Sequence, residues 1–82
     1  METRRFTDPA ITAVFQAHPQ KHYNVVPLRL LDGKVGFDVE GPDIDETLKE
    51  IYSNISIPIL SYLQALKTLR GAIFALKDAH NG

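Results

Sequence analysis

The sequence contains no cysteine, which excludes disulfide scaffolding, thiolate metal sites and cysteine nucleophiles. It also lacks an uncharged apolar run of the roughly 18 residues that a membrane span needs. Lys67, Arg70 and Lys77 interrupt the most apolar region, and the opening residues METRRFTD lack the apolar run of a signal peptide. We therefore expect a cytoplasmic protein without a membrane partner.

Neither sign of charge dominates the chain. Nine Lys and Arg residues against ten Asp and Glu residues give a net charge of −1, with the signs mixed along the sequence. A nucleic-acid-binding surface usually shows a concentrated basic face. Arg29 and Lys34, with Lys21, form only a small basic group on the expected hairpin, and Asp38 and Glu40 share its face. DNA binding through the hairpin is therefore a possible function that we rank below the two described next.

No catalytic or cofactor motif is present. The serines have no nucleophile-elbow sequence around them. Gly33, Gly36 and Gly41 lie within a hairpin pattern, whereas phosphate-binding loops join a strand to a helix. The acidic residues between 38 and 46 do not have the spacing of a calcium loop. We expect no catalytic residues, no cofactor and no metal site.

One loop keeps an alternative function open. His18, His22 and Tyr23 lie close together in sequence, and imidazoles can bind zinc or transfer protons. No third ligand accompanies them, which weakens the pattern. The alternative is therefore a small-ligand or metal-binding protein, or an enzyme, that uses this loop.

Eighty-two residues allow one domain with a modest core. Thr7 or Asp8 before Pro9 predicts a short helix over about 8–17, with Ile11, Val14 and Phe15 on its apolar face. Its end is set by the His18-Pro19 pair. A helix over about 43–53 follows the Gly41-Pro42 break, with acidic residues in its first turn.

Residues 23–40 form the clearest β-hairpin pattern. Asp32-Gly33 is typical of a two-residue type I′ turn, which would pair Leu28 with Phe37 and place the apolar residues on one face. A three-residue loop would mix the two faces, so we favour the two-residue turn. In that register Pro27 occupies a position that needs a hydrogen-bond donor, so we expect a bulge, a bend or the end of pairing there.

The last third predicts a long helix over about 57–80, capped by Ser56 with Pro58 in its first turn. Its large apolar residues recur with 3-4-3-4-3 spacing at Ile59, Tyr62, Leu66, Leu69, Ile73 and Leu76. A second stripe consists of small residues at Ser61, Ala65, Thr68, Ala72, Ala75 and Ala79. The large stripe should cover the hairpin, which leaves the small stripe for another helix backbone.

These patterns predict an α+β fold in the order α-β-β-α-α, with one antiparallel hairpin packed on helices. Such a long helix in so small a chain suggests a homodimer with an isologous interface. We expect a non-catalytic assembly or protein-interaction module, and its interface residues would be Ala65, Thr68, Ala72, Ala75, Ala79, Leu63 and Phe74.

Overall fold

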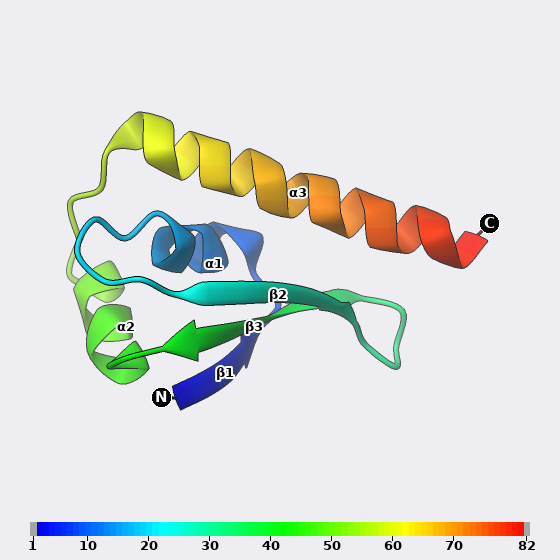
Figure 1. The fold of residues 1–82 in the computed structure, drawn as a ribbon, viewed down its shortest axis with the longest axis horizontal. Helices are drawn as coiled ribbons and strands as arrows, with labels where there is room; N and C mark the ends of the chain where they lie inside the picture. Colours follow the sequence, from blue (N-terminus) through cyan, green and yellow to red (C-terminus); the bar gives the residue numbers. More distant parts are fainter. Residues whose placement is uncertain (1, 82) are drawn as a thin grey trace.

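A computed structural model describes residues 2–81, with side chains as far as Lys77. The elements follow the order β-α-β-β-α-α, and the strands form one antiparallel sheet with the spatial order β1-β3-β2 (Figure 1). Their bounds are β1 Glu2–Phe6, α1 Pro9–Gln16, β2 Asn24–Arg29, β3 Val35–Gly41, α2 Ile44–Tyr52 and α3 Ile59–Asn81. The predicted α+β class and its five elements are confirmed, and β1 precedes them as a strand that the sequence pattern did not indicate.

The helix ends are set by local side-chain and backbone chemistry. Asp8 caps α1 by accepting a hydrogen bond from the backbone amide of Ala10 at 2.9 Å. Helix α2 ends before Asn54, whose φ of 63° turns the chain out of the helix. In α3 the first helical amide bond runs from Tyr62 to the carbonyl of Pro58, so Ser56 does not lie at the expected capping position.

The hairpin uses a three-residue loop, so the predicted two-residue turn is wrong. Pro27 pairs with Phe37 and Val25 with Val39, one residue out of the expected register. Gly33 closes the loop with a φ of 87°, a conformation that suits glycine. Val35, Phe37 and Val39 face the helices as predicted, whereas Val26, at 50% exposed, lies on the opposite face of the sheet.

Pro27 explains this register. Hydrogen-bonded and non-bonded pairs alternate along an antiparallel ladder. The amide of Leu30 donates to the carbonyl of Lys34 at 2.8 Å, which makes Pro27–Phe37 a non-bonded pair. The nitrogen of Pro27 therefore points away from β3, and pairing continues through the proline without the expected bulge. The two-residue register would have left a ladder acceptor without its donor.

Helix α1 lies between α3 and the sheet, as Figure 1 shows. Its Ala13 packs in one cluster with residues of β3 and α3, and its Phe15 packs in a second with residues of β3 and α2. Leu69 of α3 is 3% exposed, and Tyr62, Leu66, Ile73 and Leu76 pack against the first cluster. The large apolar stripe thus covers the core as predicted, except for Ile59, which is 65% exposed.

Candidate functional site

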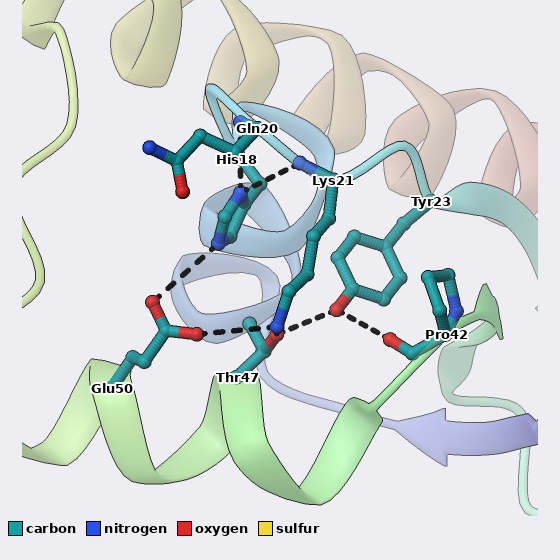
Figure 2. Close-up of polar contacts among 7 residues, drawn as sticks. All are labelled: His18, Gln20, Lys21, Tyr23, Pro42, Thr47 and Glu50. Atoms are coloured by element: carbon teal, nitrogen blue, oxygen red, sulfur yellow. Dashed lines mark hydrogen bonds and ion pairs between the residues drawn. The ribbon is translucent and has the colours of Figure 1, made fainter.

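The loop that follows α1 is fixed by the imidazole of His18. Its Nδ1 accepts hydrogen bonds from the backbone amides of Gln20 and Lys21, both at 3.1 Å. Because Nδ1 is an acceptor, the proton of the neutral ring lies on Nε2. The side chain is 2% exposed, and Nε2 lies 3.7 Å from a carboxylate oxygen of Glu50 in α2, too far for a hydrogen bond (Figure 2).

The hydroxyl of Tyr23 continues this network toward α2. It donates to the carbonyl of Pro42 at 2.7 Å and shares a 2.5 Å hydrogen bond with Oγ1 of Thr47 (Figure 2). Tyr23 is 5% exposed and Thr47 is fully buried. Both hydroxyl groups therefore form their hydrogen bonds inside the protein, as buried polar groups generally do.

Lys21 closes the network at its solvent side. Its Nζ lies 3.4 Å from Oε1 of Glu50 and 3.5 Å from Oγ1 of Thr47. Partial burial lowers the pKa of Lys21, but the hydrogen bond to Glu50 and the nearby negative charges, including Asp43, together raise it above its usual value. The ammonium thus stays charged and neutralises the Glu50 carboxylate that faces His18.

This geometry makes the His18 network a structural connection between the loop and α2. The free nitrogen of His18 has no access to solvent, and a cation beside Glu50 would meet the charge of Lys21. His22, the third residue of the predicted ligand site, is exposed and does not take part. Among the described residues, no group of three or more His, Cys, Asp or Glu side chains could hold a metal ion.

The small-residue stripe of α3 is partly occupied by the chain itself. Ala65 is 7% exposed and belongs to the core cluster around Phe37. Ser61 and Thr68 border an open groove of about 420 Å³ between α3 and the end of α1. None of the groove residues is Lys, Arg, Asp or Glu, and the others are Gln16, Ala17, His18, Pro19, Pro58, Gln64 and Ala65. Ala72 is half-buried, Ala75 is exposed, and the side chain of Ala79 lies outside the described residues.

A different face of α3 is the most exposed apolar surface of the helix. Leu60, Leu63 and Phe74 are 78%, 50% and 70% exposed, although such side chains normally gain free energy by burial. We define the outer face of α3 by these three residues and the exposed residues that share their side of the helix: Leu60, Leu63, Lys67, Arg70, Gly71, Phe74 and Lys77. Figure 1 shows α1 and the sheet on one side of α3 and no described element on the side away from them.

The charge of the outer face has one sign. Lys67, Arg70 and Lys77 are all exposed, and residues 59–77 contain no Asp or Glu. None of the three forms an ion pair with another side chain in the described part of the chain. The face thus combines large apolar groups with cations that have no counterion among the described side chains.

Gly71 lies at one edge of the outer face, on the side that turns toward the small-residue stripe. A Cβ added there would meet nothing within 4 Å, so no contact among the described residues explains a glycine at this position. Glycine in a helix interior destabilises it by roughly 0.5–1 kcal/mol relative to alanine. A neighbouring backbone that approaches the helix closely is a physical reason to accept that cost.

The sequence pattern places Leu63 and Phe74 on this face among Lys67, Arg70 and Lys77, but it did not single out Leu60 or Gly71. The pattern was available, because Leu60, Leu63, Lys67, Arg70, Phe74 and Lys77 repeat the spacing of the large stripe one position later. Three of the six are charged, and such residues usually mark a solvated helix surface. Only the exposure of the apolar members distinguishes this face from an ordinary polar one.

The acidic residues between 38 and 46 are dispersed. Asp38 pairs with Arg5 at 2.8 Å and Asp45 with Arg4 at 2.6 Å, both across to β1. The hydrogen bond from Arg5 holds the pKa of Asp38 below its usual value.

Within residues 2–81, no helix combines the length and apolar character of a membrane span.

Comparison with known proteins assigns this chain to no family. No protein-family model matches the chain, and neither the curated proteins nor the solved structures gave a match.

Proposed function

We propose that this chain is a non-catalytic protein-interaction module that docks through the outer face of α3. The supporting observation is the alignment of Leu60, Leu63 and Phe74 on one exposed side of a single helix. Scattered exposed apolar residues are ordinary, whereas an aligned group of large ones is typical of an interaction surface. The His18 loop supports the ligand-binding alternative less well, because its polar groups bond to one another and His22 lies apart.

Site-specific photo-crosslinking tests this proposal and captures a partner of any identity. A photoreactive phenylalanine analogue replaces Leu63 in one variant and Tyr52 of α2 in another, and both are expressed in the native host. Both positions are at least half exposed, so the fold tolerates the change. We expect a discrete adduct from position 63 that Phe74→Glu abolishes, and none from position 52. Equal adducts at both positions, or none at position 63, would contradict the proposal.

Gly71→Ala separates docking from stability. The added methyl group has room in the isolated chain, and it should raise the free energy of unfolding by roughly 0.5–1 kcal/mol. The same methyl group would obstruct a closely packed partner, so the yield of the position-63 adduct should fall. Chemical denaturation and adduct quantification check the two effects, and a more stable variant with unchanged adduct yield would remove Gly71 from the docking surface.

A further inference from the structure

The outer face of α3 has the spacing of a coiled-coil seam. Leu60, Leu63, Lys67, Arg70, Phe74 and Lys77 follow the 3-4-3-4-3 pattern that places residues at the core positions of two paired helices. Three of these positions are apolar and three are cationic. The seam runs for about 26 Å at 1.5 Å per residue along a helix whose outer side is uncovered (Figure 1).

We infer that the outer face of α3 pairs with an acidic amphipathic helix of another protein. That helix would place carboxylates opposite Lys67, Arg70 and Lys77 and apolar side chains opposite Leu60, Leu63 and Phe74. The inference rests on the proposed function and names the chemistry of its partner. Charge complementarity carries it, because the three cations Lys67, Arg70 and Lys77 outnumber the single acid of α3, Asp78.

A second copy of the chain fits this seam poorly. In an antiparallel pair of α3 helices, Leu63 would meet Phe74, but Lys67 would meet Arg70 twice at the centre. In a parallel pair each cation would face its own copy. Like charges placed against each other oppose association, and they do so most strongly where apolar neighbours exclude water. The cations therefore select against self-pairing through this face.

A lipid surface also fits less well than a protein helix. Lys67 lies between Leu63 and Phe74 along the same line of the helix, four positions after the first and seven before the second. Interfacial helices keep their cations on the polar side and insert the opposite one. Here insertion of the apolar residues would carry the ammonium group of Lys67 with them, whereas a partner carboxylate would neutralise it in place.

The chain itself supplies a probe for this inference. K67E/R70E keeps every apolar residue of the seam and turns α3 into an acidic amphipathic helix. In an antiparallel pair with the wild-type chain, each new glutamate meets a cation. Both substituted residues are exposed, so the fold should be retained, which circular dichroism verifies. We expect a 1:1 mixture at low salt to form a complex of twice the 9.2 kDa chain mass, measured by sedimentation velocity.

Controls show whether the seam is responsible. K34E/K49E makes the same change of charge at exposed positions outside α3, and it should bind the wild-type chain at least about tenfold more weakly than K67E/R70E. L63E in the wild-type partner should reduce the complex similarly. A mixture that forms no complex, a control that associates equally well, or a wild-type dimer that L63E abolishes under these conditions would each overturn the inference.

The two proposals fail in different ways. Adducts at position 63 in the host, combined with no complex in the purified mixture, would leave the interaction module in place and remove the acidic helix as its partner. Absence of the adduct would remove the module itself. The photo-crosslinking and the charge-inverted mixture therefore report on separate claims.

Discussion

At the residue scale, the Tyr23 hydroxyl links three parts of the chain through its bonds to Pro42 and Thr47. Tyr23→Phe should lower the free energy of unfolding by about 1–3 kcal/mol, because it leaves the Pro42 carbonyl without its donor and the buried Thr47 hydroxyl without its acceptor. Thr47→Val alone should destabilise by a comparable amount. The double variant should lose less than the sum, since each single change already breaks the shared bond. Urea denaturation measures all three, and strictly additive losses would show that the bond contributes nothing.

Arg5 and Asp38 lie directly opposite each other on neighbouring strands. The hydrogen bond lowers the pKa of Asp38, so the pair stabilises the fold above the unfolded-state pKa and loses this contribution as pH falls through the lower folded-state value. Arg5→Gln should return the pKa of Asp38 toward its ordinary range. An NMR titration of the Asp38 carboxyl carbon checks this, and an unchanged midpoint would show that Arg5 is not the cause.

At the element scale, the hairpin depends on a single backbone conformation. Gly33→Ala forces a Cβ into the left-handed region and should destabilise the fold by roughly 1–2 kcal/mol. Gly33→Asn should cost less, because asparagine adopts this conformation more readily. Thermal unfolding compares the two variants. Equal losses would mean that the side-chain surroundings, not the positive φ, determine the effect.

The hairpin also shows how far sequence reasoning reached. Alternation and the Asp32-Gly33 pair correctly located the turn and two strands, and Asp8-Pro9 correctly located the start of α1. The predicted strand register is wrong, because it followed the apolar alternation and placed Pro27, which has no N–H, where the ladder needs a hydrogen-bond donor. The conflict at Pro27 was visible in the sequence, and it was resolved by a change of register in place of a bulge.

Other elements show why the rest was not predictable. Strand β1 reads Glu-Thr-Arg-Arg-Phe, and four of its five residues are exposed, so no apolar alternation marks it. It forms because β3 offers a free edge, which is a tertiary cause that local patterns do not contain. The stripes of α3 were correctly spaced, but which of them stays uncovered depends on where α1 packs.

At the scale of the whole molecule, charge is divided between α3 and the rest. The α3 sequence, residues 59–81, carries three cations and one acid, whereas residues 2–58 carry six basic and nine acidic residues. The seam cations should keep the wild-type chain monomeric at low salt. At 1 M salt the Debye length, the distance over which charges act on each other in solution, falls to about 3 Å. Because the repulsion between the seam cations of two chains is then screened, the apparent mass should rise with salt. Light scattering over a tenfold concentration range tests this, and a mass that falls with salt would contradict it.

The homodimer predicted from the small-residue stripe stays a prediction. Ala65 is occupied within its own chain, so a second copy that used this stripe would have to rely on the exposed members around Thr68 and Ala75. The same light-scattering series distinguishes the two surfaces. A dimer that persists at low salt and withstands Leu63→Glu would place the contact on the small-residue stripe.

Pro27 also bears on the solubility of the molecule. Strand β2 is an edge strand, and an unprotected edge can recruit strands from other chains into aggregates. Because the nitrogen of Pro27 points outward and carries no hydrogen, an incoming strand would find no donor at the middle of this edge. Arg4 and Arg5 place charge on the opposite edge strand, β1. The sheet is thus poorly suited to growth by strand addition.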